Sequence, residues 1–347
     1  MINQVREKMN SSKIDTLWIT DTHSIDFLTK YHCEAGERFI GLCITQQEVI
    51  LVLNHLFEYD GISEVQVVYY YDFEDVHELI SKHTVGKVGV DKFMSTQFSL
   101  PLSKSFDLVI GSDCVDRLRA IKNENEIQKM VAASKLNDYV MSLVPSLLKE
   151  GVSEKEVAVK IQKLFFDNGA DALSFQIIVA FGANCADPHA VPSDRKLKKD
   201  ESIIIDMGCK LNGYCSDMTR TFFLNKNPIK EIYDIVLLAN QEAIKAIKPG
   251  CKFSDIDKVA RMIIEKAGYG VHFNHRLGHG IGKEVHEPYD VSMSNDVLIE
   301  PGMCFSIEPG IYVKNQFGVR IEDLVYVNQD GVAVLFNEYT KEDEVIK

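Results

Sequence analysis

Short hydrophobic runs separated by polar residues fill the first third of the chain. Six of these runs are rich in β-branched and aromatic residues and have the length of strands, and one stretch between them has helical periodicity. The predicted strands are residues 16–19, 39–44, 48–53, 65–70, 87–90 and 108–110, and the predicted helix is 75–83. This alternation predicts a separate α/β domain. No group of side chains in this part is typical of a catalytic site.

The rest of the chain predicts two pairs of helices, each pair followed by strand-like runs. A charged segment from Asp116 is expected to be a linker that continues into a long helix. Ser153 and Glu156 have the spacing of a capping box at the start of the next helix. The second pair is expected to begin near Pro228 and Ser254. The four helices are expected to end near Glu150, Gly169, Gly250 and Gly268.

A hairpin turn defines the geometry of a first acidic pair. Asn212-Gly213 is the strongest short hairpin signal, and strand-like residues flank it. If these two residues form the loop, counting back places Asp206 opposite Thr219. Asp217 shares a face with Thr219 because strand side chains alternate with period two. The backbones of Asp206 and Asp217 would then lie roughly 7–8 Å apart, which lets their carboxylates converge.

A second acidic pair follows the same pattern. Glu308 ends the apolar run 303–307, and Glu322 lies in the alternating run 319–327, which predicts one strand. Because carboxylates this close repel each other, a cation between them is expected. Oxygen-rich ligands with one imidazole suit manganese, zinc, cobalt or iron(II). Four carboxylates exceed the ligand set of one catalytic zinc and fit two ions about 3.5–4 Å apart.

The acidic pairs also indicate an internal repeat. The string LKKDESIIIDMG from Leu197 is echoed by LIEPGMCFSIEPG from Leu298, and SDMTRT from Ser216 is echoed by VRIEDL from Val319. We therefore predict two α-α-β halves related by a pseudo-twofold axis, with the four acids meeting at that axis.

Two histidines lie in a glycine-rich string. His275 and His279 have the i, i+4 spacing of a zinc-binding pair on a helix. The glycines at positions 278, 280 and 282 disfavour a helix there. They indicate instead a backbone that packs closely against a ligand or another strand.

These motifs resemble those of the metallopeptidase family with the pita-bread fold, which includes methionine aminopeptidase, aminopeptidase P and the Xaa-Pro dipeptidases (prolidases). The prolidase and aminopeptidase P branch fits best. The resemblance is carried by IIIDMGCKLNGYCSDMTRT from Ile203, HRLGHGIGKEVHEP from His275, FSIEPG from Phe305, VRIED from Val319 and ADPHAVPS from Ala186. It implies an α/β (α+β) chain with a creatinase-like N-terminal α/β domain and a C-terminal pita-bread domain with internal pseudo-twofold symmetry.

The resemblance also implies metal ligands. Asp206 would bind one ion, His279 and Glu308 the other, and Asp217 and Glu322 would bridge both. The expected cofactors are two divalent ions, with manganese favoured and cobalt, zinc or iron as alternatives. A hydroxide that the two ions share would attack the peptide carbonyl.

Further roles follow for residues around the metal site. His286 would stabilise the oxyanion, Glu308 would move the water proton, and His189 would bind the substrate and assist the leaving nitrogen. His275 is expected to support the pocket wall or to contact substrate. Arg320 shares a strand face with Glu322 and is expected to bind a substrate carboxylate, unless it forms an ion pair with Asp323 or another neighbouring acid.

The leading functional hypothesis is a prolidase that hydrolyses Xaa-Pro dipeptides or short proline peptides. Three alternatives stay open. One is an aminopeptidase P that removes the first residue of longer Xaa-Pro peptides. The second is a non-catalytic peptide-binding relative, and the third is a creatinase-like hydrolase without metals. The last two are disfavoured because such relatives lose metal ligands, and this chain keeps all five.

Length, composition and charge restrict the remaining possibilities. A chain of 347 residues suggests two domains, 1–118 and 119–347. The net charge of −13 and the absence of a basic stripe argue against nucleic-acid binding. No apolar run reaches the length of a membrane span, and the first residues lack the apolar core of a secretion signal. The expected location is the cytoplasm, where the eight cysteines would be reduced.

In the resembled family the N-terminal domain covers the catalytic pocket of a partner subunit, so a homodimer is expected. The stretch 31–39 aligns with a loop that reaches across, and His32, Glu34 and Arg38 would serve there. A solvated loop is the alternative interpretation.

Overall fold

A computed structural model describes residues 1–33 and 36–347, so Glu34 of the expected reaching loop lies outside the described residues. The chain divides into two compact units, Met1–Arg119 and Ala120–Lys347, and each is described by itself. This division lies one residue from the boundary expected from the sequence. In the described ranges, no helix is both long enough and apolar enough to cross a membrane.

The first unit contains a six-stranded mixed sheet in the order β4-β3-β2-β1-β5-β6. Its strands are β1 (Thr16–Ile19), β2 (Gly41–Ile44), β3 (Val49–Asn54), β4 (Gln66–Tyr70), β5 (Val88–Val90) and β6 (Leu108–Ile110). Its helices are α1 (Ile2–Ser11), α2 (Thr22–Thr29), α3 (Val76–Lys82), α4 (Thr96–Leu102) and α5 (Asp113–Ala120). The α/β domain and its six strands are confirmed. The linker expected from Asp116 is wrong, because Asp116 lies inside α5.

The second unit repeats two helices followed by strands. The first half contains α6 (Glu124–Leu143), α7 (Glu154–Asp167), β7 (Ala172–Leu173), β8 (Ile178–Phe181), β9 (Ser202–Met207), β10 (Cys209–Leu211), β11 (Tyr214–Cys215) and β12 (Met218–Leu224). The second half contains α8 (Lys230–Ala246), α9 (Phe253–Lys266), β13 (Gly278–Gly280), β14 (Glu287–Val291), β15 (Cys304–Ile307), β16 (Gly310–Val313), β17 (Phe317–Arg320), β18 (Asp323–Val327), β19 (Ala333–Leu335) and β20 (Glu344–Ile346). The predicted capping box of Ser153 and Glu156 begins α7, whereas α9 begins at Phe253, one residue before the predicted start.

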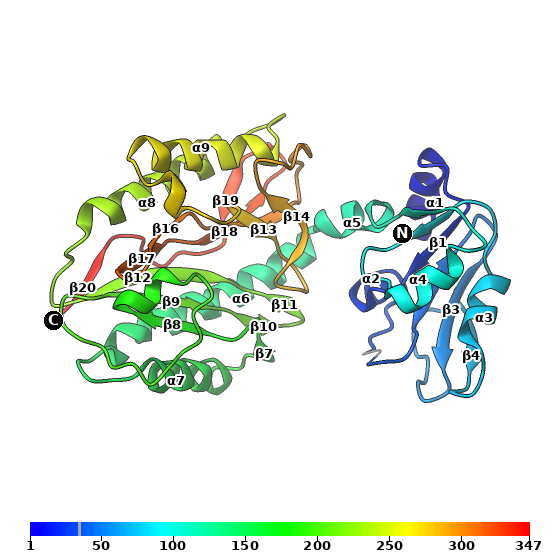
Figure 1. Cartoon of the computed structure of the whole chain (residues 1–347), viewed down its shortest axis with the longest axis horizontal. Helices are drawn as coiled ribbons and strands as arrows, with labels where there is room; N and C mark the ends of the chain where they lie inside the picture. Colours follow the sequence, from blue (N-terminus) through cyan, green and yellow to red (C-terminus); the bar gives the residue numbers. More distant parts are fainter. Residues whose placement is uncertain (34–35) are drawn as a thin grey trace. The chain divides into compact units, whose positions relative to one another are not determined.

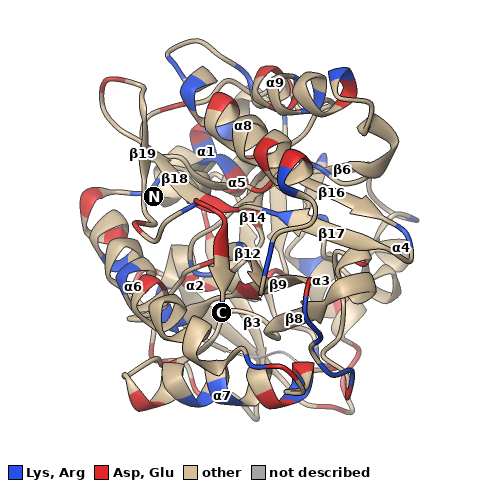
Figure 2. Cartoon of the chain, turned by 90° about the vertical axis from the view of Figure 1, so that its left-hand side faces the viewer, with Lys and Arg blue, Asp and Glu red and all other residues tan. Residues whose placement is uncertain are grey.

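Within this unit the strands lie between two pairs of helices. Helices α6 and α7 lie on one side of the strands, and α8 and α9 lie on the other (Figure 1). The neighbouring strands β12, β9 and β8 in one sheet correspond to β18, β15 and β13 in another. Lys and Arg alternate with Asp and Glu along α7, α8 and α9, which is typical of solvated helix faces (Figure 2).

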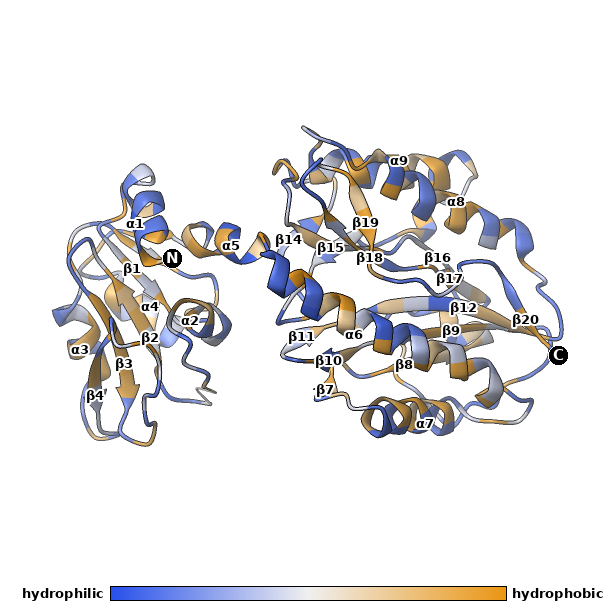
Figure 3. Cartoon of the chain, turned by 180° about the vertical axis from the view of Figure 1, so that it is seen from behind, coloured by the Kyte–Doolittle hydropathy of each residue, from blue (hydrophilic) through white to orange (hydrophobic). Residues whose placement is uncertain are grey.

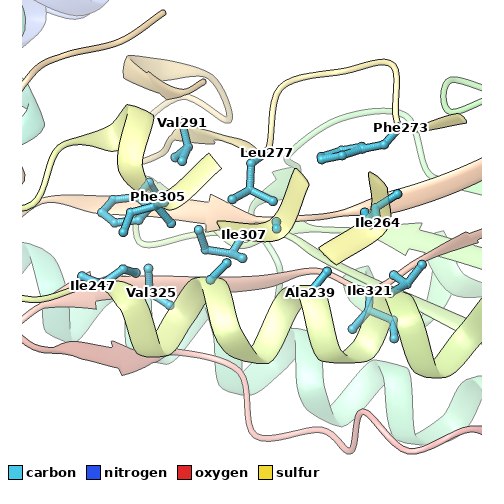
Figure 4. Close-up of a cluster of buried hydrophobic side chains, with 14 of the residues drawn as sticks. Ala239, Ile247, Ile264, Phe273, Leu277, Val291, Phe305, Ile307, Ile321 and Val325 are labelled. Carbon is cyan, nitrogen blue, oxygen red and sulfur yellow. The ribbon is translucent and has the colours of Figure 1, made fainter. Parts of the chain in front are cut away.

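Each half has its own hydrophobic core between helices and sheet. Strand β9 is largely hydrophobic, whereas β12 and α6 contain both hydrophobic and hydrophilic residues (Figure 3). In the second half, Ile307 and Ile321 are fully buried in the cluster that includes Ala239 of α8 (Figure 4). Because neighbouring side chains along an extended chain point to opposite sides, burial of these isoleucines directs Glu308 and Glu322 away from this core.

The pairing of the strands confirms one predicted register and corrects another. Asp206 lies opposite Thr219, as counted back from the Asn212-Gly213 turn. The prediction of one strand over 319–327 is wrong, because β17 ends at Arg320 and β18 begins at Asp323. The break leaves Glu322 outside both strands. Its backbone N–H donates to the carbonyl of Thr219 at 3.1 Å, which joins the two halves.

Candidate metal-dependent active site

A cavity of about 720 Å³ opens between the strands of the second unit. This volume suits a short peptide or another ligand of that size. Every candidate metal-binding, catalytic and substrate-binding residue predicted from the sequence lines it. They are His189, Asp206, Asp217, His275, His279, His286, Glu308, Arg320 and Glu322.

The acids reach this cavity from strand ends and from the break between strands. Asp206 is the penultimate residue of β9, Asp217 directly precedes β12, and Glu308 directly follows β15. Asp206, Asp217 and Glu322 are buried. One ligand atom from each of Asp217, His279 and Glu322 lies within 4.8 Å of the other two. These three residues could therefore hold a metal ion together.

The Nε2 atom of His279 carries no proton and faces the acids. Its Nδ1 lies 3.1 Å from the carbonyl of Gly280, and since a carbonyl only accepts, Nδ1 carries the proton. Nε2 lies 3.6 Å from Asp217 Oδ2 and 3.5 Å from Glu308 Oε1. Burial lowers the pKa of His279 to about 3, so the imidazole is neutral at pH 7 and its Nε2 lone pair is available to a metal.

Close backbone packing explains the glycines next to His279. A Cβ on Gly278 would lie 1.9 Å from the carbonyl oxygen of Ser306, and a Cβ on Gly280 would lie 2.4 Å from that of Pro288. The rejection of a helix and the expectation of a tightly packed backbone are both confirmed. His279 lies in β13, and its backbone N–H donates to Ser306 Oγ at 3.0 Å.

Three of the acids at this site each have a buried carboxylate oxygen that no described residue binds. Asp206 Oδ1, Asp217 Oδ1 and Glu322 Oε1 have no hydrogen-bond partner among the described residues. Burial, followed by repulsion from neighbouring acids, raises the pKa of Asp217 and Glu322 well above their usual values. Burial also raises the pKa of Glu308 to about 7, with Arg320 opposing the shift. Divalent cations fit this donor set, because they would coordinate the unpartnered oxygens and remove the repulsion.

Arg320 forms an ion pair with an expected metal ligand. Its Nη2 lies 2.7 Å from Asp206 Oδ2, and its Nε donates to Thr219 Oγ1 at 3.1 Å. The Thr219 hydroxyl in turn donates to Glu322 Oε2 at 2.7 Å. Arg320 therefore forms an ion pair, but the expected partner is wrong: the acid is the distant Asp206, whereas Asp323 pairs with Arg220 and Lys341. Binding of a substrate carboxylate by Arg320 stays a prediction.

A second arginine that the sequence analysis did not single out lines the same cavity. Arg276 is exposed, whereas Arg320 is 2% exposed and has N–H groups committed to Asp206, Thr219 and Tyr312. Arg276 directly follows His275, so its position in the histidine-bearing string was the available signal. The site thus offers an accessible guanidinium for an anionic group of a ligand.

His275 is connected to Arg320 through Tyr312. Its Nδ1 lies 2.7 Å from the Arg276 carbonyl and so carries the proton, which leaves Nε2 to accept from the Tyr312 hydroxyl at 3.0 Å. The Tyr312 oxygen accepts from Arg320 Nη1 at 2.9 Å. Burial lowers the pKa of His275 to about 4. These contacts fit the expected role in the pocket wall.

His189 lies on a segment that a buried carboxylate anchors at both ends. Glu154, at the start of α7, is fully buried and accepts from the backbone N–H groups of Phe181 and Ser193 at 2.8 and 2.9 Å. It also accepts from the Asn184 side-chain amide at 2.9 Å. The anchored segment leaves the His189 side chain exposed at the cavity.

His286 lies on a turn held by a buried ion pair. Its ring contacts the His279 ring edge to face, with centroids 4.3 Å apart, and burial lowers its pKa, so a neutral ring can donate one N–H. Glu287 Oε1 accepts from the backbone N–H of Lys283 at 2.9 Å. Its Oε2 lies 3.0 Å from Lys122 Nζ, and both side chains are buried. The sequence gave no signal for Lys122.

In the first unit, Arg38 forms a bidentate ion pair with Asp72. Its Nε donates to Oδ1 at 3.0 Å and its Nη2 donates to Oδ2 at 2.9 Å. This contact occupies the guanidinium within its own unit, and His32 is exposed. Whether residues of this loop reach a partner's pocket stays a prediction.

Carboxylates with unpartnered oxygens, the neutral imidazole of His279 beside them and a peptide-sized cavity fit the site of a metal-dependent hydrolase. Comparison with known proteins gives the family. Residues 128–329 match metallopeptidase family M24, and residues 1–121 match the creatinase/prolidase N-terminal domain. The chain belongs to metallopeptidase family M24 and has its pita-bread fold.

Known relatives resemble the whole chain. An uncharacterized peptidase of Staphylococcus epidermidis is 39% identical over 98% of this chain and 99% of its own length. The crystal structure of the dipeptidase PepE from Mycobacterium ulcerans has a TM-score of 0.94 at 30% identity and covers 99% of this chain and 96% of its own. A recombinant prolidase from Thermococcus sibiricus has a TM-score of 0.90 at 31% identity, with coverages of 99% and 98%.

Proposed function

We propose that this metallopeptidase is an Xaa-Pro dipeptidase (prolidase) that uses two divalent metal ions. The observation that carries the proposal is the set of buried, unpartnered oxygens on Asp206, Asp217 and Glu322 in a cavity of peptide size. Similarity over nearly the full chain to a solved dipeptidase and a solved prolidase supports the substrate class.

Five residues would hold the ions. Asp206 would bind one, His279 and Glu308 the other, and Asp217 and Glu322 would bridge them. Manganese is favoured for this oxygen-rich set, with cobalt, zinc or iron as alternatives. When bound, divalent ions would lower the pKa of water to about 7 and polarise the substrate carbonyl.

The other residues of the site would move protons and orient the peptide. Ser306 donates to Glu308 Oε1, which leaves Glu308 Oε2 to take a proton from the attacking water. The neutral His286 ring would donate to the carbonyl oxygen as charge develops on it. His189 would bind the substrate and give a proton to the leaving nitrogen, and His275 would support the pocket wall.

Proline specificity requires recognition without an amide N–H. An Xaa-Pro bond lacks that donor, so most peptidases fail on it. In a dipeptide, the free carboxylate of the proline is a group that the enzyme can recognise instead. Arg320 was the predicted partner for it, and Arg276 is the more accessible of the two guanidinium groups. The homodimer and the cytoplasmic location belong to this proposal as well.

The test compares Ala-Pro with Ala-Pro-Ala, with added Mn²⁺ and after chelation. A dipeptidase cleaves Ala-Pro with the higher kcat/KM and loses both activities on chelation. Similar efficiency on the two peptides would identify an aminopeptidase P. Hydrolysis that survives chelation would identify a creatinase-like hydrolase without metals. If neither peptide is cleaved with added manganese, cobalt, zinc or iron, the protein is a peptide-binding relative without catalysis.

A further inference from the structure

A group of buried polar side chains lies directly behind the metal-ligand strands. It consists of Arg220, Asn240, Asp323 and Lys341, which we call the Asp323 clamp. Asp323 is completely buried, with Oδ1 lying 2.7 Å from Arg220 Nη2 and Oδ2 lying 2.7 Å from Lys341 Nζ. Among the described residues that line the cavity, no member of the clamp appears, so its side chains do not touch the substrate space.

The clamp holds the backbone that carries Glu322. Arg220 Nη1 donates to the carbonyl of Glu322 at 2.6 Å and to that of Thr219 at 2.9 Å. These bonds fall at the break between β17 and β18, where Glu322 lies outside both strands. Since a strand ladder does not fix Glu322, its position depends on such bonds.

The clamp also holds the backbone next to Glu308. Lys341 Nζ donates to Asn240 Oδ1 at 3.1 Å, and Asn240 Nδ2 donates to the carbonyl of Ile307 at 2.9 Å. The ammonium group of Lys341 therefore connects to both Glu308 and Glu322, through Asn240 on one side and through Asp323 on the other.

In the first half of the unit an asparagine also donates to a backbone carbonyl next to an expected metal ligand, but no lysine binds that asparagine. Asn137 Nδ2 donates to the carbonyl of Met207, next to Asp206, at 2.9 Å. Its Oδ1 is buried and has no hydrogen-bond partner among the described residues, whereas Asn240 Oδ1 has Lys341. The lysine is thus an addition to the second half, where the strand is broken.

Lys341 comes from the C-terminal segment Tyr339–Lys341, which lies beyond the family match at residues 128–329. The segment is fixed in place, because Arg220 donates to the carbonyls of Tyr339 and Thr340, each at 2.8 Å. The strand that follows it, β20, pairs in parallel with β12 (Figure 1).

We propose that Lys341 is a positioning residue of the metal centre, and that the C-terminal segment is a working part of the site. The inference rests on the proposed metal binding. Lys341 fixes Glu308 and Glu322 from behind, so that the two ligands meet at the spacing that a cation needs. Loss of a group that orients metal ligands typically weakens metal binding about 10–100-fold.

The test measures Mn²⁺ affinity of the metal-free full-length protein by calorimetry. Lys341→Met leaves Asp323 paired with Arg220, so the fold should survive, as circular dichroism would verify. We expect Mn²⁺ binding to weaken at least about tenfold and Lys341→Arg to recover part of the loss. Lys230→Met is the matched control. It removes an exposed lysine that pairs with Asp343 of the same tail, at 3.4 Å, without touching the clamp, and should bind Mn²⁺ like the wild type.

A second measurement follows hydrogen exchange of residues 319–324 in the metal-free proteins. Exchange should be faster in Lys341→Met and unchanged in Lys230→Met. Wild-type Mn²⁺ affinity in a folded Lys341→Met, whatever its melting temperature, would overturn the inference and leave the proposed function standing. A wild-type protein that binds no divalent metal would overturn both. If Lys341→Met does not fold, Lys341→Gln is the second variant, because it keeps a polar group but is too short and uncharged to bind Asn240 and Asp323 together. Mn²⁺ binding should weaken about tenfold there as well, and wild-type affinity in folded Lys341→Gln would overturn the inference.

Discussion

Arg320 and Asp206 form a buried ion pair, with Nη2 and Oδ2 separated by 2.7 Å. Through Thr219 the same guanidinium is also linked to Glu322. A fixed positive charge therefore contacts Asp206 of the first half directly and is linked to Glu322 of the second half through the Thr219 hydroxyl. It offsets part of their repulsion and orients Asp206, which leaves the opposite oxygen, Oδ1, for a cation.

This arrangement predicts different defects for the two arginines of the cavity. Arg320→Lys keeps a charge but cannot contact Asp206, Thr219 and Tyr312 together, so Mn²⁺ affinity should fall about tenfold or more. Arg276→Gln should bind Mn²⁺ normally and lose the preference for Ala-Pro over its C-terminal amide. The measurements are calorimetry and kcat/KM for both substrates. If Arg320→Lys abolishes that preference while Arg276→Gln retains it, the carboxylate is bound by Arg320.

His286 and His279 should separate turnover from metal binding. His286→Ala removes a hydrogen-bond donor to the oxyanion and should lower kcat on the order of 10²–10³-fold with metal content unchanged. His279→Ala and Asp217→Ala remove ligands and should lose metal itself. Elemental analysis of the three variants checks this. An empty site in His286→Ala together with a filled one in His279→Ala would reverse the two assignments.

Metal binding should release protons and strengthen as pH rises. Burial raises the pKa of Asp217 and Glu322, and that of Glu308 to about 7, so the folded metal-free protein binds these protons more tightly than the unfolded chain does. Its stability therefore falls as pH rises through these values, whereas bound cations require the ionised acids. Melting temperatures of chelated and Mn²⁺-loaded protein should diverge between about pH 6 and about pH 8. A constant difference would contradict the prediction.

The protein should bind two divalent ions per chain at saturation. Chelation should abolish activity and leave the fold intact, because each half of the second unit has its own hydrophobic core. Elemental analysis gives the stoichiometry, and circular dichroism gives the fold. At most one ion per chain would defeat the two-metal proposal.

Glu154 should act on substrate through His189. Glu154→Gln places an amide donor among the N–H groups of Phe181, Asn184 and Ser193, so the segment that bears His189 should shift, and kcat/KM should fall by as much as about 10²-fold with metal content unchanged. The matched control is Glu150→Gln, an exposed acid four residues earlier that lies outside the capping box of α7. In a His189→Ala background the Glu154→Gln loss should largely disappear. Additive losses would show that Glu154 serves stability alone.

Several features were fixed by local rules, and so they were predictable. The Asn212-Gly213 turn sets the pairing of Asp206 with Thr219, because a two-residue loop and a period of two leave one register. The helix pairs followed from capping and glycine signals. The glycines around His279 indicated a packed backbone because a Cβ there would have no room.

Other features depended on contacts between segments far apart in the chain. Alternation predicted one strand over 319–327, but the backbone of Glu322 leaves the strand to bond Thr219 of the other half. Arg320 is 114 residues from Asp206, and Lys341 reaches Asp323 and Asn240 from beyond every recognised motif. Period and spacing describe only near neighbours, so the sequence determined which residues line the cavity but not the break in the strand at Glu322. The packing of the two halves decided which charges meet, because buried ions pair with whatever group the fold brings within about 3 Å.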